Sequence, residues 1–279
     1  LYEPLKEAGA LYGDTFGWER AKWYAAKDEK ENYSFRRNNS FAAVAKEWKA
    51  VRERVGLTDL TSFSKYEVSG KDAQGFLERL CANRVPTKAG GIVLSQMLTE
   101  KGGIESEATI ACLAENHYYL LSAAVAELHD FDWLVQHIQK GEGVSVTNVT
   151  EDFGVLLLTG PLSRDVLSIL TETNLSNESG FTWMRAREIS VSGIPVRALR
   201  VSYVGELGWE LHCPMPRLAE LYDALMKAGE SHGIRRFGTY AMNSLRMEKA
   251  YKGWGSELTT EISLVESDML RFARKSGGY

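Results

Sequence analysis

The alternation of apolar and polar positions divides the chain into strands and helices in mixed order. Strands are predicted where apolar residues recur at every second position or in short apolar runs, over 58–68, 93–98, 104–113, 117–122, 144–149, 153–158, 189–191 and 196–203. Helices are predicted where apolar residues recur three and four positions apart, over 42–54, 71–81, 125–139, 216–228 and 238–251, with a further helix starting at Gly160-Pro161. Residues 1–41 are polar, aromatic and irregular. Because strands come in hairpin runs broken by helices, the sequence predicts an α+β fold with mostly antiparallel sheets and flanking helices.

Size and composition limit the class of protein. With 279 residues the chain is long enough for one large or two modest domains, at about 100–200 residues each. A net charge of −4 argues against nucleic acid as a partner, because nucleic-acid binding usually needs a basic face. No apolar run approaches the roughly 20 residues of a membrane span, so no membrane partner is expected.

The cysteines and the ends of the chain indicate where it works. Cys81, Cys112 and Cys213 lack C-x-x-C spacing, so neither a disulfide framework nor a zinc site is predicted. Their odd number favours reduced thiols, in the cytoplasm or, in a eukaryote, the mitochondrial matrix. The start at Leu1 has no signal-peptide pattern, and residues 275–279 end in a turn-like stretch. Both ends are expected to be cut from a longer chain.

The segment 200–211 holds the most informative chemistry. Gly205 and Gly208 allow a tight reversal between two predicted strands, which would place the Tyr203 ring and the Glu210 carboxylate on neighbouring strands. A flat, nitrogen-rich heterocycle needs such a pair, because it requires a face to stack on and an acceptor for its ring N–H groups. The alternative is an ordinary hairpin with surface charges.

A second candidate lies in the strand after Lys101-Gly-Gly103. Glu105 and Glu107 alternate with Ser106, so they share one face of the strand, and Glu107 stands where the strand becomes apolar. A carboxylate at that place would have a raised pKa and could move protons near neutral pH. A solvated pair at a sheet edge is the alternative.

Other motifs are absent or favour a structural role. There is no G-x-G-x-x-G after a strand, no P-loop and no G-x-S-x-G, and the five histidines lack metal-site spacing. No metal is therefore expected. Arg246 and Glu248 lie in the middle of a predicted helix, where an ion pair to a strand is favoured over catalysis.

Several stretches together resemble the aminomethyltransferase (glycine cleavage T-protein) family. They are closest to its branch fused behind a flavin domain, the dimethylglycine dehydrogenase, dimethylglycine oxidase and sarcosine dehydrogenase group. The matching stretches are Phe16-Gly-Trp-Glu-Arg20, Val55-Gly-Leu-Thr-Asp-Leu60, Met97-Leu-Thr-Glu-Lys-Gly-Gly103, Gly160-Pro161, residues 203–210 and Gly238-Thr-Tyr-Ala-Met-Asn-Ser-Leu-Arg-Met-Glu-Lys249. They span nearly the whole chain in the family's order, which favours a site over an ordinary hairpin at Tyr203.

The resemblance implies a tetrahydrofolate site. Tyr203 would flank the pterin, and Glu210 would accept hydrogen bonds from its amino and ring N–H groups. The resemblance adds further residues to this site, namely Leu211 and His212 beside Glu210, the strand residues Glu107, Ala108 and Thr109 at the reactive edge of the pterin, and Arg271, where related dehydrogenases can have a Tyr near folate.

Two departures from the family pattern bear on the branch. Many members have Asp where this chain has Glu107, whereas the dimethylglycine dehydrogenase branch resembles this chain in having Glu. The Glu side chain is longer than that of Asp and moves the carboxylate by about one methylene. Met242 stands where T-proteins proper carry an Arg for folate, which argues against a plain T-protein.

The resemblance also implies two lobes. One lobe would comprise residues 1–62 plus 153–279, and residues 63–152 would form an inserted α/β hairpin lobe. The flavin domain that carries FAD would precede this chain, and a small C-terminal barrel would follow Tyr279; both are expected to be missing.

Three functions are implied. In the first, a flavin domain of the same longer chain oxidises a methylated amine such as dimethylglycine or sarcosine. The iminium or formaldehyde product then meets tetrahydrofolate here, Glu107 moves one proton, and 5,10-methylenetetrahydrofolate forms. The second is a folate-binding or structural module without chemistry. The third is a stand-alone aminomethyltransferase or demethylase acting on another one-carbon donor.

Overall fold

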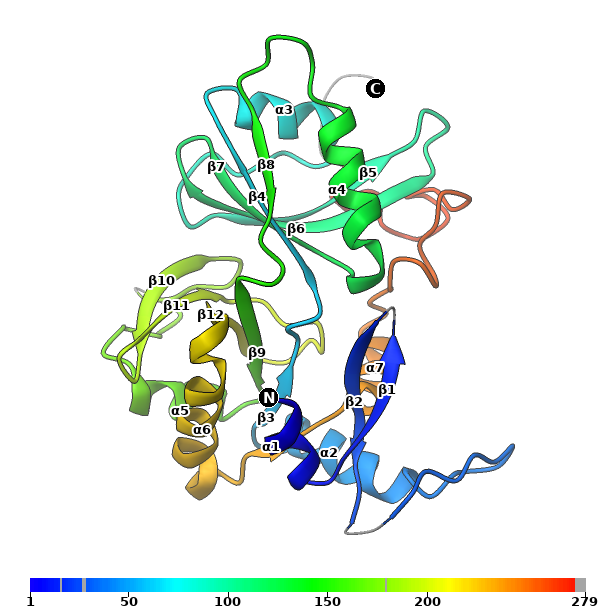
Figure 1. Cartoon of the computed structure of the whole chain (residues 1–279), viewed down its shortest axis with the longest axis vertical. Coiled ribbons are helices and arrows are strands. Elements are labelled where there is room, and N and C mark those ends of the chain that lie inside the picture. Colours follow the sequence, from blue (N-terminus) through cyan, green and yellow to red (C-terminus); the bar gives the residue numbers. More distant parts are fainter. Residues whose placement is uncertain (16, 27–28, 179, 274–279) are drawn as a thin grey trace. The chain divides into compact units, whose positions relative to one another are not determined.

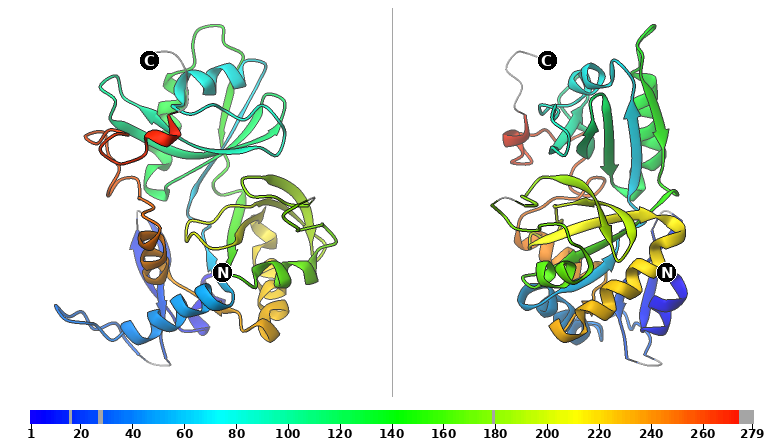
Figure 2. Two further views of the ribbon diagram at one scale, coloured as in Figure 1. Left: turned by 180° about the vertical axis from the view of Figure 1, so that it is seen from behind. Right: turned by 90° about the vertical axis from the view of Figure 1, so that its left-hand side faces the viewer.

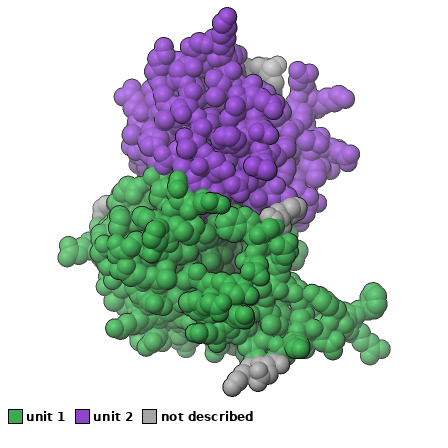
Figure 3. Space-filling view, viewed as in Figure 1, with its two compact units in different colours: residues 1–62, 151–183, 187–251 green, residues 63–150, 184–186, 252–279 purple. Residues whose placement is uncertain are grey.

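The computed structural model describes residues 1–15, 17–26, 29–178 and 180–273, and it divides into two compact units (Figure 3). Unit 1 comprises Leu1–Ser62, Glu151–Trp183 and Arg187–Tyr251, and unit 2 comprises Phe63–Thr150, Met184–Ala186 and Lys252–Tyr279. The sequence-based division into 1–62 plus 153–279 and 63–152 stays a prediction. The compact units differ from it mainly in the C-terminal part, since residues from Lys252 onward belong to unit 2. Phe16 and residues 275–279 lie outside the described residues.

Unit 1 contains, within its described residues, a six-stranded sheet and a separate hairpin (Figure 1). The sheet order is β10-β11-β12-β9-β3-β13, and the hairpin pairs β1 with β2. The strands are β1 (Ala10–Thr15), β2 (Trp18–Tyr24), β3 (Gly56–Asp59), β9 (Phe153–Thr159), β10 (Ala186–Val191), β11 (Ile194–Leu199), β12 (Gly208–Pro214) and β13 (Arg235–Arg236). The α-helices are α1 (Tyr2–Glu7), α2 (Phe41–Glu53), α5 (Ser163–Leu170), α6 (Leu218–Gly229) and α7 (Thr239–Glu248).

The centre of the sheet in unit 1 is the apolar strand β9. It pairs antiparallel with β12 on one side and with β3 on the other, and Leu158 lies opposite both Trp209 and Leu57. Helices α5 and α6 supply Leu167 and Leu221 to the same buried core. The backbone of β9 is paired along both edges, and nearly every residue in the strand is buried, as its continuous apolar run predicts.

The hairpin β1–β2 corrects the prediction that residues 1–41 are irregular. Its residues are mostly half-exposed, and Trp23 is fully buried, so the hairpin lacks the clean alternation by which strands are recognised.

A buried carboxylate of α2 joins the hairpin to α2 and to the start of α7. Glu47 of α2 is only 4% exposed and accepts hydrogen bonds from the backbone N–H of Tyr24 (2.7 Å) and of Gly238 (2.9 Å), the residue that precedes α7. Burial raises the pKa of Glu47 to about 7, although these two hydrogen bonds work in the opposite direction.

Unit 2 is built, within its described residues, on a five-stranded antiparallel sheet of order β5-β6-β7-β4-β8 (Figures 1 and 2). Its strands are β4 (Ser64–Ser69), β5 (Ile92–Leu98), β6 (Ile104–Ala114), β7 (His117–Ser122) and β8 (Ser145–Asn148), and its α-helices are α3 (Ala73–Leu80) and α4 (Glu127–Gln136). Phe76 and Leu77 of α3 and Leu134 of α4 share one core with Ile110 and Leu120 of the sheet. The predicted α+β class with mostly antiparallel sheets is therefore confirmed.

The C-terminal part of unit 2 covers the start of β6. The backbone N–H of Ile104 lies 3.2 Å from the carbonyl oxygen of Thr259 and 3.1 Å from that of Ile262. Leu258 and Leu264 pack with Ile104 in a small separate core. Gly103 is needed here, because an added Cβ would stand 1.8 Å from the carbonyl oxygen of Thr260.

The three cysteines are buried, Cys81 and Cys112 in unit 2 and Cys213 in unit 1. Burial raises the pKa of the Cys112 thiol, and it raises that of Cys213 to about 11. Among the described residues, no helix combines the length and the apolar character needed to cross a bilayer.

We expect Gly238→Ala to destabilise the protein by about 2 kcal/mol or more, because its Cβ would lie 2.2 Å from the carbonyl oxygen of Lys22 and backbone atoms cannot move aside cheaply. Urea unfolding followed by circular dichroism measures the change. Gly75→Ala in α3 is the matched control, since an added Cβ there meets nothing within 4 Å and Ala favours the helix. Equal midpoints for the Gly238→Ala variant and the wild type would contradict the expectation.

Candidate functional site

Tyr203 lies on a loop of unit 1, not on a strand. Strand β11 ends at Leu199, which pairs with Glu210 at the last position of the β11–β12 ladder. The chain then turns, with hydrogen bonds from Val201 N to Leu199 O (2.9 Å) and from Gly205 N to Ser202 O (3.3 Å). The predicted strand over 196–203 is therefore wrong beyond Leu199, as is the placement of Tyr203 and Glu210 on adjacent strands. The alternation of Val201 and Tyr203 continues past the point where backbone pairing stops.

The loop is held at its C-terminal end by one carbonyl group. The oxygen of Leu207 accepts hydrogen bonds from Gly160 N (2.7 Å), Thr159 Oγ1 (3.0 Å) and Ser163 Oγ (3.2 Å). Gly205 adopts a φ of +73°, a conformation that favours glycine. The turn predicted at this glycine is thus present, and the loop is tied to the end of β9 and the start of α5.

The half-buried Tyr203 lies near other rings and charges of unit 1. Its ring centroid is 6.4 Å from that of Tyr251, and the ring planes are 25° apart. Arg20 of β2 is influenced by both Asp59 and Tyr203. Burial lowers the pKa of its guanidinium, and these two neighbours oppose that shift. Tyr203 thus lies near a second aromatic ring and a buried guanidinium.

Strand β12 sends its residues alternately to the core and to the opposite face. Leu211 is fully buried in the core of unit 1, whereas Glu210 and His212 share the other face. The carboxylate of Glu210 is 16% exposed, and its Oε2 lies 3.6 Å from Nε2 of the fully buried His212. Of the three residues predicted on this strand, Leu211 can therefore offer a ligand only its backbone.

Glu107 lies on β6 in unit 2, opposite Gln96 of β5. Gln96 Nε2 donates a 2.7 Å hydrogen bond to Glu107 Oε2. Burial raises the pKa of Glu107 to about 7, while the Gln96 hydrogen bond and the charge of Lys252 act in the opposite direction. The side chain is still partly exposed, which leaves a carboxylate that can exchange a proton near neutral pH.

The alternation along β6 also separates the neighbours of Glu107. Glu105, Glu107 and Thr109 are half-buried on one face, as predicted for the two glutamates. Ala108 belongs to the core on the other face. Arg271 is exposed on a short 3-10 helix (Leu270–Phe272), where its guanidinium lies 5.1 Å from the Phe272 ring centroid.

The predicted site residues fall into two groups. Tyr203, Glu210, Leu211 and His212 belong to unit 1, and Glu107, Ala108, Thr109 and Arg271 belong to unit 2. Within each group the structure places a carboxylate on the non-core face of a strand.

Sequence reasoning missed Gln96, the partner of Glu107. The signal was present, because Gln96 is a polar residue inside the apolar strand predicted over 93–98, and it is fully buried. The sequence also predicted an ion pair between Glu248 and a strand, and that prediction is wrong. Trp48 Nε1 donates to Glu248 Oε1 (2.7 Å), and Arg52 Nη2 lies 3.5 Å from Glu248 Oε2; both residues belong to helix α2, not to a strand.

The comparisons with known proteins identify the family. A family model described as the GCVT N-terminal domain matches residues 1–276. Mitochondrial dimethylglycine dehydrogenase of Homo sapiens is 40% identical over 277 residues, which cover 98% of this chain and 32% of that protein. An aminomethyltransferase of Anoxybacillus flavithermus is 33% identical over 237 residues, or 85% of this chain and 64% of that protein. This chain thus spans about a third of the length of the dimethylglycine dehydrogenase.

A solved structure agrees with this result. Glycine cleavage system aminomethyltransferase T from Bartonella henselae superposes with a TM-score of 0.81 at 25% identity, covering 98% of this chain and 68% of that one. The chain belongs to the GCVT aminomethyltransferase family. The predicted family and the T-protein-like fold are both confirmed.

The hydrogen bond from Gln96 can be tested through the pKa of Glu107, measured by NMR on the labelled side-chain carboxyl carbon. Hydrogen bonds to charged groups contribute about 1.5–3 kcal/mol, so Gln96→Ala should raise the Glu107 pKa by about one or more. Lys252→Ala should also raise it, because a nearby positive charge is lost. The exposed Lys140→Ala removes the same charge elsewhere in unit 2 and should leave the value near 7. An unchanged pKa in Gln96→Ala would refute this account.

Proposed function

We propose that this chain is the tetrahydrofolate-binding, one-carbon transfer region of a flavin-dependent N-methyl amine dehydrogenase or oxidase of the dimethylglycine or sarcosine type. Its family membership supports an aminomethyltransferase-type activity. The observation that carries the proposal is Glu107, a partly exposed carboxylate with a pKa of about 7 on the non-core face of β6. A group of that pKa at neutral pH suits general acid–base catalysis.

The residues of unit 1 fit a reduced pterin. Such a ring presents flat faces and several N–H donors. Glu210 offers a partly exposed carboxylate as acceptor, with His212 beside it, and Tyr203 offers a half-buried ring. Leu211 would contribute through its backbone. Thr109 would lie with Glu107 at the reactive edge, and Ala108 would contribute only its backbone there. Arg271 is an exposed candidate for the outer part of the ligand.

The protein's own part in the reaction is to bind, orient and move one proton. Tetrahydrofolate, when bound, would supply the two nitrogens N5 and N10 that share the one-carbon unit in 5,10-methylenetetrahydrofolate, with the amine of an iminium or the oxygen of formaldehyde (as water) leaving, and the first nitrogen to attack loses its proton. The deprotonated Glu107 would accept the proton released at that nitrogen. Gln96 fixes one oxygen of the carboxylate by its hydrogen bond and so orients the group.

The one-carbon donor and the partner belong to the same proposal. A flavin domain of the same longer chain would carry FAD and oxidise the methylated amine, and the iminium or formaldehyde would reach this region. Met242, which stands where T-proteins proper have an Arg, is buried in α7 and favours this fused branch. The similarity to stand-alone aminomethyltransferases supports the alternative, a T-protein-like enzyme with another donor. A reducing location, cytoplasmic or in the mitochondrial matrix, stays a prediction.

We expect Glu210→Gln to weaken tetrahydrofolate binding by about tenfold or more, because one acceptor oxygen becomes a donor that faces the pterin N–H groups. Isothermal titration calorimetry on the whole chain measures the affinity. Glu188→Gln is the matched control, since Glu188 is an exposed carboxylate on β10 of the same sheet. Lack of any heat with the wild type would contradict folate binding, and equal loss in both variants would contradict the role of Glu210.

We expect Glu107→Gln to bind tetrahydrofolate normally and to transfer the one-carbon unit about 100-fold more slowly or worse, because a general base is lost. The readout is the rate of 5,10-methylenetetrahydrofolate formation from formaldehyde, above the uncatalysed rate. The wild-type rate should fall as pH drops through about 7, since protonation removes the acceptor, and this inflection should vanish in the variant. Glu115→Gln, in the turn after β6, is the control. A Glu107→Gln variant with the full rate would exclude Glu107 from the mechanism.

A further inference from the structure

An exposed segment of unit 1 joins β2 to α2, and residues 29–41 of it are here named the aromatic arm. The arm projects beyond the N-terminal end of α2 (Figures 1 and 2). It carries three aromatic side chains on its surface. Tyr33 is 75% exposed, Phe41 is 51% exposed and Phe35 is fully exposed. Several large aromatic side chains exposed on one short segment mark an interaction surface more often than an ordinary solvated surface.

The arm also carries exposed positive charge. Arg36 and Arg37 are both exposed, and the guanidinium of Arg37 lies 4.2 Å from the Phe41 ring centroid. The whole chain has a net charge of −4, so these arginines form a local basic surface on an acidic protein. The two carboxylates of the arm already have partners, one on β2 and one within the arm. Glu31 contacts Lys22, and Glu29 Oε1 accepts from Asn39 Nδ2 (2.9 Å).

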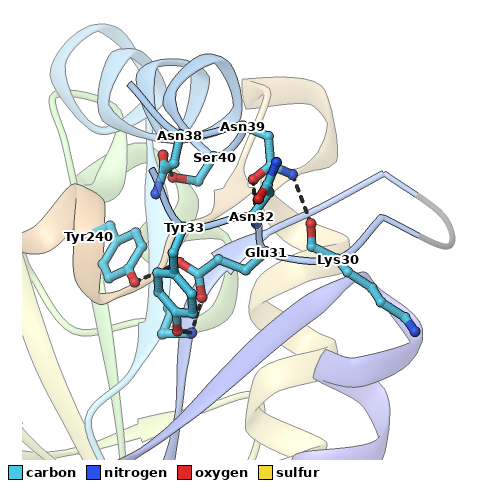
Figure 4. Close-up of polar contacts among 9 residues, drawn as sticks. Lys30, Glu31, Asn32, Tyr33, Asn38, Asn39, Ser40 and Tyr240 are labelled. Atoms are coloured by element: carbon cyan, nitrogen blue, oxygen red, sulfur yellow. Dashed lines mark hydrogen bonds and ion pairs between the residues drawn. The ribbon is translucent and has the colours of Figure 1, made fainter. Parts of the chain in front are cut away.

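A polar framework holds the arm in shape (Figure 4). The side chain of Asn39 accepts from Asn32 N (2.9 Å) and donates to the carbonyl oxygen of Lys30 (2.8 Å) as well as to Glu29. These three hydrogen bonds join Asn39, near the end of the arm, to residues 29–32 at its start. The hydrogen bonds close the arm near its two ends and so limit the conformations open to the residues between them, which lowers the entropy lost when a partner binds.

The base of the arm is fastened to the rest of unit 1. Glu31 bridges Lys22 of β2 and the Tyr240 hydroxyl of α7, which donates a 2.7 Å hydrogen bond, and Lys22 Nζ also donates to the Tyr33 hydroxyl (3.1 Å). Burial opposes ionisation of Glu31, but the hydrogen bonds from Lys22, Tyr240 and Tyr33 keep its pKa below the ordinary value. The arm thus has a charged, hydrogen-bonded base and an aromatic, basic outer surface.

We propose that the aromatic arm is a docking surface for a protein segment that carries carboxylates around apolar side chains. Aromatic residues and arginine are the residue types that dominate the energy of protein interfaces. Guanidinium groups bind carboxylates with two parallel hydrogen bonds, and the exposed rings of Tyr33 and Phe35 need apolar partners. The arm has only three basic residues, Lys30, Arg36 and Arg37, too few for the broad basic face of nucleic-acid binding or the clusters of four to eight that anionic membranes attract. None of these residues belongs to the proposed folate site.

The experiment uses the whole chain and a fluorescein-labelled peptide with three Asp-Phe-Glu-Leu repeats. A second peptide, with Asn and Gln in place of the acids, has the same shape without the charge. Fluorescence anisotropy should show binding to the acidic peptide at least tenfold tighter than to the amide peptide. Arg36→Gln combined with Arg37→Gln should lose at least tenfold in affinity, and Phe35→Ser should lose a similar factor.

Matched controls separate the arm from general surface effects. Lys49→Gln removes an exposed charge on α2, and Trp183→Ser removes an exposed ring elsewhere in unit 1; both should bind as the wild type does. Asn39→Ala leaves every proposed contact side chain in place and removes the framework, so it should weaken binding severalfold, mainly through faster dissociation. Circular dichroism verifies that each variant is folded.

Four outcomes would overturn the proposal. They are absence of binding to the acidic peptide at millimolar concentration, equal affinity for the amide peptide, an equal loss in the control variants, and tighter binding to phosphatidylserine vesicles or a DNA duplex than to the acidic peptide. The last would assign the arm to a membrane or a nucleic acid instead.

Discussion

The two-residue period of β-strands is the constraint on which the candidate site depends. On β6 and on β12, the side chains of one face pack with helices in an apolar core. Polar side chains that meet a ligand can therefore lie only on the opposite face. Glu107 and Glu210 both lie on that opposite face. A slip of one residue in either strand would bury a carboxylate in an apolar core and expose Ala108 or Leu211 instead. Packing of the cores therefore places the two candidate carboxylates.

Much of the fold can be predicted because most elements bury apolar residues in a regular pattern. The helices α2, α3, α6 and α7 lie within a few residues of their predicted ranges, and β7 coincides with its range. What the pattern cannot reveal is a buried carboxyl group that joins two elements. By residue type alone Glu47 would be placed on the surface of α2. It instead accepts two backbone hydrogen bonds, which connect α2 to β2 and to the start of α7. The β1–β2 hairpin was missed for a related reason, since it contacts the rest of unit 1 through this carboxylate and the buried Trp23 and has no alternating face.

The candidate site could be predicted only in part. The carboxylate positions followed from strand alternation, and their roles came from resemblance to a family. The loop position of Tyr203 could not be read from the sequence, because alternation does not show where a ladder of backbone hydrogen bonds ends. The partner of Glu107 on the adjacent strand needed the β5–β6 register, which the turn before Ile104 sets only together with a bulge between Met97 and Leu98, and neither is visible in either strand alone.

The buried cysteines give each unit its own internal reporter. A thiol reacts as the thiolate, and burial holds Cys112 and Cys213 in the neutral form inside folded cores. Modification by a thiol reagent must therefore wait for an opening of the surrounding structure. Cys213 belongs to unit 1, and Cys81 and Cys112 belong to unit 2. Labelling kinetics resolved by mass spectrometry would therefore follow the opening of each unit separately, without any substitution in the chain.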